Sequence, residues 1–132
     1  MTNYIFLLVW FCLFFSACSS INDPYAEGKP LYLRHCANCH MDDGSGLEGL
    51  IPPLAKADVL QNAGASAACM IRNGLKGKMQ VNGIEYDGEM LPNAKISDVE
   101  ILNILNYINN AWGNQRDFIK LDDVKTALKG CQ

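Results

Sequence analysis

The clearest hydrophobic pattern in the chain lies near its C-terminal end, from residue 97 to residue 112. Apolar side chains recur there at the three- and four-residue spacing of an amphipathic helix. They are Ile101, Leu102, Ile104, Leu105 and Ile108. Ser97, followed three residues later by Glu100, is typical of the capping box that begins a helix. We therefore predict a long helix that starts after Ser97 and ends at Gly113-Asn114.

A second pattern, alternation of side-chain type, covers residues 79–86. Residues 79–81 and 84–86 are two short runs with β-branched and aromatic members, and Asn82-Gly83 separates them. An Asn-Gly pair favours the type I′ turn, because both of its positions need a positive φ. We predict a small β-hairpin.

Two shorter helices are predicted on either side of this hairpin. Residues 66–73 form a short helix with one apolar face, and Gly74 follows as a left-handed cap. Residues 122–129 suggest a short amphipathic helix in the C-terminal tail.

The first helix of the domain has two possible starts. It begins either at Asp23 as the N-cap, or near Gly28 with Pro30 at its first position. With either start we expect Tyr32 and Leu33 to face inward. Since Gly28 has no side chain, another helix could cross closely there.

The N-terminal stretch is predicted to be a leader, because residues 4–15 are almost wholly apolar. This run is too short to span a bilayer as a helix and is typical of a signal peptide. The small residues before Cys18 are typical of a lipobox. We therefore expect a signal peptide at 1–17, a lipidated Cys18 with a short tether at 18–23, and one domain at 24–132. Ordinary secretion and an uncleaved anchor are the alternatives, and all three place the domain outside the cytoplasm.

Composition narrows the classes of function. A chain of 132 residues is long enough for one small domain. Its net charge of −3 argues against a nucleic-acid partner, which would require clustered basic residues.

The residues with the most specific chemistry are Cys36, Cys39 and His40, in a C-x-x-C-H motif. This spacing is typical of covalent haem c attachment, in which the two thiols bind the haem vinyl groups and the histidine binds the iron. A zinc half-site would need a second ligand pair, and none follows at that spacing. A redox dithiol would follow a strand, whereas the flanking sequence here favours helix.

From about Asp23 to its end, the chain resembles the class I single-haem cytochromes c. The resemblance rests on a helix running into C-x-x-C-H, a Pro-x-Leu element at Pro52 and Leu54, a methionine shortly before a proline, and a C-terminal helix. It implies an all-α cytochrome c fold, with about three to five helices around one covalent haem and the hairpin before the distal methionine loop. It also implies that the Pro52 carbonyl accepts a hydrogen bond from His40 Nδ1 and that Leu54 packs against the haem.

The same resemblance implies a methionine as the distal iron ligand. Met90 is the candidate, because Pro92 follows closely and a helix N-cap lies seven residues further on. Met79 is the rival. The remaining methionines lie in the leader, next to the proximal histidine and inside a predicted helix, at Met1, Met41 and Met70.

Two of the six cysteines have no role in the leader, the lipobox or the haem motif. These are Cys69 and Cys131. In an oxidising compartment two such thiols suggest a disulfide, and two unpaired thiols are the alternative.

These features predict an electron carrier of the cell envelope and not an enzyme. An iron held on both faces by His40 and Met90 has no open position for substrate, so electron transfer is its remaining chemistry. Expected partners are the membrane, through the lipid anchor, and a quinol-oxidising complex, a terminal oxidase, a dehydrogenase or a reductase in a respiratory chain. The alternatives are a peroxidase-like or gas-binding haem protein whose methionine dissociates, and a lipoprotein whose motif binds no haem.

Overall fold

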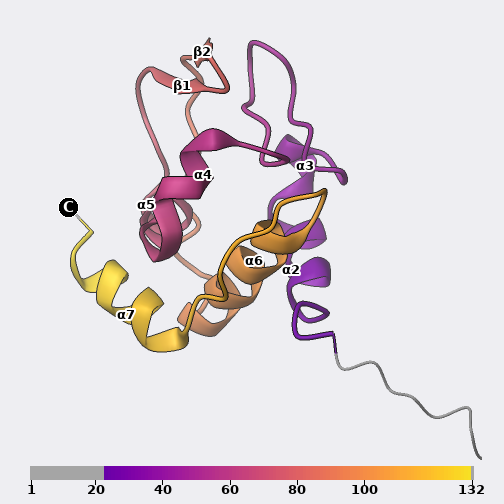
Figure 1. The fold of residues 1–132 in the computed structure, drawn as a ribbon. Helices are drawn as coiled ribbons and strands as arrows, with labels where there is room; N and C mark the ends of the chain where they lie inside the picture. The colour runs from indigo at the N-terminus through magenta and orange to yellow at the C-terminus, as the bar shows by residue number, and fades with distance from the viewer. Residues whose placement is uncertain (1–22, 132) are drawn as a thin grey trace, which may run out of the picture.

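The computed structural model describes residues 23–131, which form a helical domain with one small hairpin (Figure 1). In chain order its elements are α2 (Gly28–His35), α3 (Ala37–His40), α4 (Asp58–Ala63), the 3₁₀ helix η1 (Gly64–Ser66), α5 (Ala67–Asn73), β1 (Met79–Val81), β2 (Ile84–Tyr86), α6 (Asp98–Asn110) and α7 (Leu121–Lys129). The predicted all-α fold with one small hairpin is confirmed.

The first and the long C-terminal helices, α2 and α6, pack directly against each other. Gly28 lies at the crossing, and a Cβ there would collide with the Asn103 carbonyl oxygen and Tyr107 Cβ. Tyr32, which is fully buried, packs its ring 5.5 Å from that of Tyr107 and 4.9 Å from that of Trp112. The expected close crossing at Gly28 is therefore confirmed.

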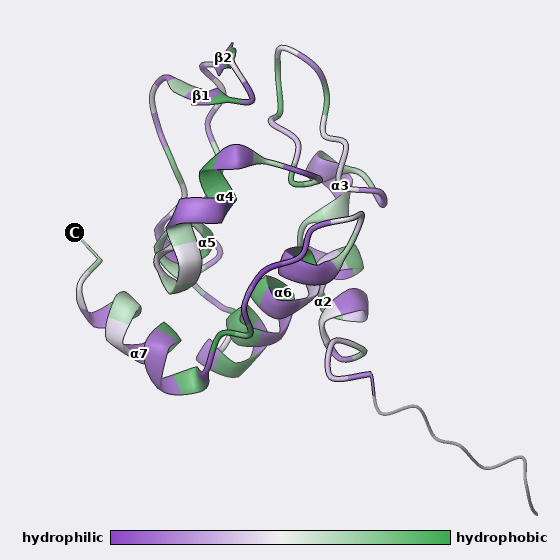
Figure 2. Ribbon diagram, in the orientation of Figure 1, coloured by the Kyte–Doolittle hydropathy of each residue, from purple (hydrophilic) through white to green (hydrophobic). Residues whose placement is uncertain are grey.

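The long helix α6 begins as predicted. Both hydrogen bonds of the capping box between Ser97 and Glu100 are present, and Ile96 and Ile101 are buried on the two sides of the cap. Figure 2 shows hydrophobic and hydrophilic positions alternating along α6, as expected for a helix with one buried face.

The start of the first helix follows the second of the two alternatives. Asp23 forms a turn instead, in which its side chain accepts a hydrogen bond from the Tyr25 amide. Helix α2 begins at Gly28, so Pro30 stands in the first turn, where its missing N–H costs no hydrogen bond. The prediction that Leu33 faces inward is wrong, since 42% of this residue is exposed, one position around the helix from the buried Tyr32.

The region between residues 58 and 74 differs in two ways from the prediction. Helix α4 was not expected. Gly74 has a positive φ of 74° but a ψ of −173°, so it is not the left-handed cap that we predicted. That extended region with positive φ is nearly restricted to glycine, and it turns the chain sharply away from the end of α5.

The hairpin is confirmed in its register and its turn. Met79 pairs with Tyr86 and Val81 with Ile84, while Asn82 and Gly83 have φ values of 52° and 79°. The Asn82 side chain accepts a hydrogen bond from the Asp58 amide, and the Asp58 side chain accepts one from the Asn82 amide. These paired bonds join the hairpin turn to the start of α4.

The C-terminal helix α7 is also confirmed, and its Val124 is fully buried. The structure contains the Cys69–Cys131 disulfide, with a Cα–Cα distance of 5.6 Å, so the end of the chain is joined to α5. Among residues 23–131, no helix is long and apolar enough to cross a bilayer. The predicted signal peptide and Cys18 lie outside the described residues.

Candidate haem site

One turn of helix brings the residues of the C-x-x-C-H motif together. The amides of Cys39 and His40 both donate to the Cys36 carbonyl, at 3.1 and 2.9 Å. Residues at positions i, i+3 and i+4 of such a turn lie on one side of it. Cys36 and Cys39 form no disulfide with each other, so both sulfur atoms are available to bind a haem.

The imidazole of His40 is held by a carbonyl, as the resemblance implied. Its Nδ1 lies 3.0 Å from the Pro52 oxygen, and the residue is only 9% exposed. A carbonyl in this position accepts the Nδ1 proton and so fixes the tautomer of the ring. The other nitrogen, Nε2, makes no hydrogen bond to a described residue and carries the lone pair available to iron.

The loop that carries Pro52 is closely packed around two glycines. The Leu54 and Ala55 amides both donate to the Gly44 carbonyl, at 2.8 and 3.0 Å. A Cβ on Gly46 would collide with the carbonyl oxygens of Ile51 and Pro52, and the Gly46 amide donates to the His40 carbonyl. This packing fixes the Pro52 oxygen relative to the histidine.

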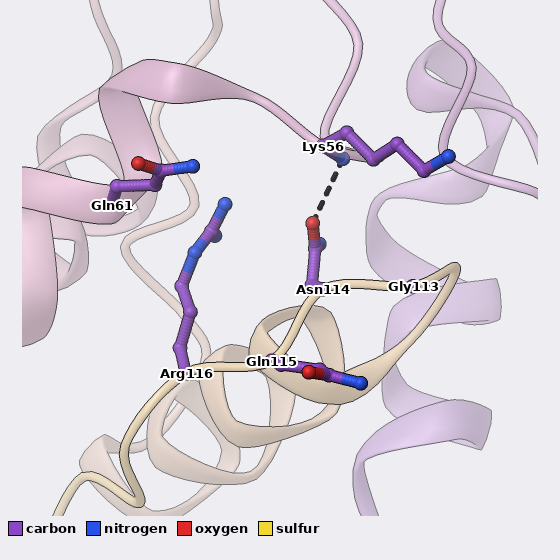
Figure 3. Close-up of a pocket in the computed structure, with 6 residues that line it drawn as sticks. All are labelled: Lys56, Gln61, Gly113, Asn114, Gln115 and Arg116. Carbon is purple, nitrogen blue, oxygen red and sulfur yellow. Dashed lines mark hydrogen bonds between the residues drawn. The ribbon is translucent and has the colours of Figure 1, made fainter.

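Asn114 secures the far end of the same loop, a role that was not predicted from the sequence. Its Oδ1 accepts a hydrogen bond of 2.8 Å from the Lys56 amide, drawn dashed in Figure 3. Its Nδ2 donates to the carbonyls of Leu54 and Ile108, at 3.1 and 2.7 Å. One buried amide therefore joins the Pro52 loop to the last turn of α6. The only signal in the sequence was an asparagine after Gly113, which indicated no more than a helix end.

Burial sets the protonation states at the motif. Desolvation lowers the pKa of His40, and the hydrogen bond to Pro52 opposes this only in part. Burial, followed by the neighbouring Cys39, raises the pKa of the Cys36 thiol to about 11. Before haem is attached, the site therefore presents at neutral pH a neutral imidazole, which is the form that binds iron, beside a protonated Cys36 thiol.

Both candidate distal methionines are partly buried against the core. Met90 forms an isolated antiparallel bridge with Leu75, with hydrogen bonds of 2.9 Å in both directions. Met79 opens β1 and pairs with Tyr86. The choice of distal ligand between these two stays a prediction at this point.

Two cavities of about 270 and 420 Å³ lie beside the segment that follows α6. The smaller cavity, shown in Figure 3, is lined by polar groups that include Lys56, Gln61 and Arg116. Neither cavity is lined by His40 or Met90, and the polar lining of the smaller one does not suit a large apolar macrocycle. The assignment of the haem site therefore rests on its donor set: two adjacent free thiols, and a buried neutral imidazole with one nitrogen engaged. That set fits haem c.

Comparison with known proteins agrees with this donor set. The family model described as cytochrome c matches residues 25–112. Cytochrome c-552 of Thermus thermophilus is 37% identical over 95 residues, which cover 69% of this chain and 72% of the relative. The cytochrome c subunit of alcohol dehydrogenase (quinone) from Gluconobacter oxydans is 32% identical over 90 residues, which cover 66% of this chain but only 18% of that subunit.

The family match includes the whole C-x-x-C-H turn, the Pro52 loop and helix α6. Covalent haem c, one per chain, and electron transfer through that haem follow from it. This chain belongs to the cytochrome c family.

Proposed function

We propose that this chain is a single-electron carrier of the cell envelope, with haem attached at Cys36 and Cys39 and its iron bound by His40 and Met90. The observation that supports it most is the buried His40 ring, whose Nδ1 is bonded to the Pro52 carbonyl and which follows two cysteines that form no disulfide. When bound, haem c supplies an iron that alternates between the ferrous and ferric states.

The chain's own residues prepare the proximal side for this role. The Pro52 carbonyl holds the ring in one orientation and raises the basicity of Nε2 through the hydrogen bond at Nδ1. Burial of His40 limits the access of water, and a drier site favours the less charged ferrous state. Leu54, which is partly buried against the core two residues after Pro52, would supply apolar surface for the haem.

Strand geometry favours Met90 over Met79 as the distal ligand. Side chains two positions apart on a strand share a face, so Met79 points to the same side as Val81, which is 1% exposed. Met79 is therefore placed to pack in the core. The Met90 backbone instead exchanges two hydrogen bonds with Leu75 in an isolated bridge, so its thioether lies on a fixed segment outside the two strands.

A pair of methionine variants tests the ligand assignment. In haem-loaded protein, Met90→Ala should lose the near-infrared methionine-to-iron band of the ferric state, because no thioether then reaches the iron. Met79→Ala is the matched control and should keep the band. Loss of the band in Met79→Ala alone would contradict the assignment. Reaction with peroxide is measured on the same samples, and a wild type as fast as Met90→Ala would favour the haem-enzyme alternative.

The envelope location and the partners are part of the same proposal. The apolar leader and Cys18 support a lipid anchor, and a tether from Ser19 to Asp23 would hold the domain within ~20 Å of the membrane surface. The family match begins at residue 25, directly after this tether. Since one relative is a subunit of a quinone-dependent alcohol dehydrogenase, we propose a membrane-associated dehydrogenase or respiratory complex as the redox partner.

Lipidation is tested by labelling cells with radioactive palmitate. The wild-type chain should carry the label and sediment with membranes, whereas Cys18→Ser should lose the label. An unlabelled wild-type protein that is released with the periplasmic contents would contradict the anchor. It would leave the haem assignment intact, because the lipid anchor depends on Cys18 and the haem site on other residues.

A further inference from the structure

The segment that carries Met90 is attached to the end of α5 by backbone hydrogen bonds. Leu75 and Met90 exchange two bonds of 2.9 Å, and the Asn93 amide donates to the Ile71 carbonyl, also at 2.9 Å. These bonds join Met90 and Asn93 of the methionine loop to the last turn of α5 and the residues that follow it. The position of Met90 is therefore set by the position of α5.

A close backbone contact and the Arg72 side chain strengthen the same connection. A Cβ on Gly74 would collide with the Met90 carbonyl oxygen, so the two backbones are in direct contact. Arg72 of α5 donates to the Ala94 carbonyl at 3.2 Å and forms an ion pair of 2.7 Å with Asp98, at the start of α6. The loop from Met90 to Asp98 is thus bound along its length by residues 71–75.

Helix α5 cannot be stable alone, because its seven residues are too few for an isolated helix in water. Its support comes from packing on both α6 and α7, and Figure 1 shows α7 beside it. The Cys69–Cys131 disulfide joins the middle of α5 to the second residue after the end of α7. Helix α7 lies beyond residues 25–112, the part that matches the cytochrome c family.

We propose that α7, secured by the Cys69–Cys131 disulfide, is a positioning element for the Met90 thioether. It stabilises α5, and α5 holds the methionine loop through Leu75, Ile71 and Arg72. Without the disulfide, the end of α5 opens more often and Met90 leaves the iron more often. This inference rests on the proposed function, in which Met90 is the distal ligand.

The test uses haem-loaded ferric protein with both cysteines replaced, Cys69→Ala with Cys131→Ala, so that no new thiol can bind the iron. Imidazole competes with the methionine for the iron, so its apparent affinity reports how often Met90 is displaced. We expect it to bind the double variant roughly tenfold more tightly than the wild type. Amide hydrogen exchange at Leu75, Met90 and Asn93 should accelerate by a similar factor, and this readout is independent of electron transfer.

Two further variants separate local opening from a general loss of stability. Val124→Ala loosens α7 while the disulfide stays intact. It should raise both the imidazole affinity and the rate of amide exchange, each by a smaller factor than in the double variant. Ile108→Ala removes a core side chain from the last turn of α6, at the opposite end of that helix from the Arg72–Asp98 pair. It should change the imidazole affinity and the exchange of the three amides far less than the double variant does.

Unchanged imidazole affinity and amide exchange in the double variant would overturn the inference, as would equal changes in Ile108→Ala. The ligand assignment is tested separately by Met90→Ala. If that variant keeps the near-infrared band, the proposed distal ligand is wrong, whatever the amides show. If it loses the band while the double variant behaves as the wild type, only the role of α7 is wrong.

Discussion

A single buried amide, that of Asn114, joins three backbone groups that are distant in the sequence. It bonds to Leu54, Lys56 and Ile108, and only 5% of the residue is exposed. Truncation of such a group leaves its buried partners without hydrogen bonds, which costs more than the bonds themselves contribute.

We predict that Asn114→Ala lowers the free energy of unfolding by about 2–4 kcal/mol, measured by denaturant titration of the haem-loaded protein. Asn110→Ala is the control, because the Asn110 side chain donates only to Asn106 within the same helix. Its cost should be about 1 kcal/mol or less, since alanine also favours the helix. Equal costs for the two variants would show that Asn114 does not secure the Pro52 loop.

At the scale of single residues, the sequence predicts a site where the residues that form it lie close together in the chain. Cys36, Cys39 and His40 lie within one helical turn, so their motif could be identified directly. The contact of His40 with Pro52 came from family resemblance, because twelve residues separate the two. Asn114 could not be predicted, since its partners at Leu54 and Lys56 come into contact only through the fold.

Among the elements, the crossing of α2 and α6 depends on one missing side chain. We predict that Gly28→Ala costs about 1–3 kcal/mol, because its Cβ would overlap the Asn103 carbonyl and force the two helices apart. Gly130→Ala serves as a matched control. Its φ is −93° and its nearest neighbour would lie 3.5 Å away, so the change should cost about 0.5 kcal/mol or less. Thermal unfolding curves that place both variants at the wild-type value would refute the close crossing.

The cap of α6 makes a pH-dependent contribution. Hydrogen bonds from the Ser97 backbone and side chain lower the pKa of Glu100 below its ordinary value of 4.5. A carboxyl whose pKa is lowered by folding adds stability above its ordinary pKa and loses that contribution as the pH falls through the lowered value. We predict that Glu100→Gln lowers the melting temperature at neutral pH and that the difference shrinks in acid. A difference that stays constant with pH would contradict the role of the charge.

The elements that were predicted correctly are those with local signals. Helix α6 has its own capping box, and the hairpin has its own Asn-Gly turn. The unexpected α4 has six residues, and its start is bonded to Asn82, 24 positions away. Gly74 was misassigned as a cap because its ψ is set by contact with Met90, which no local pattern indicates.

Across the whole molecule, the two halves of the chain supply different sides of the proposed haem site. Residues 36–54 bring the thiols, the imidazole and the carbonyl that orients it, while the loop after the hairpin brings Met90. The crossing of α2 and α6 holds the first half in place, and α5, with α7 behind it, holds the second. The function of an electron carrier depends on both halves staying closed around one iron.

An optical redox titration of the haem-loaded protein tests this most directly. We predict one reversible step with a one-electron slope of about 59 mV per decade, with the near-infrared methionine band present when oxidised and restored after each cycle. Such a result requires that His40 and Met90 both stay bound to the iron in the oxidised and in the reduced protein. A high-spin spectrum with an open coordination position, or a reduced state that does not return to the original oxidised spectrum, would contradict the account.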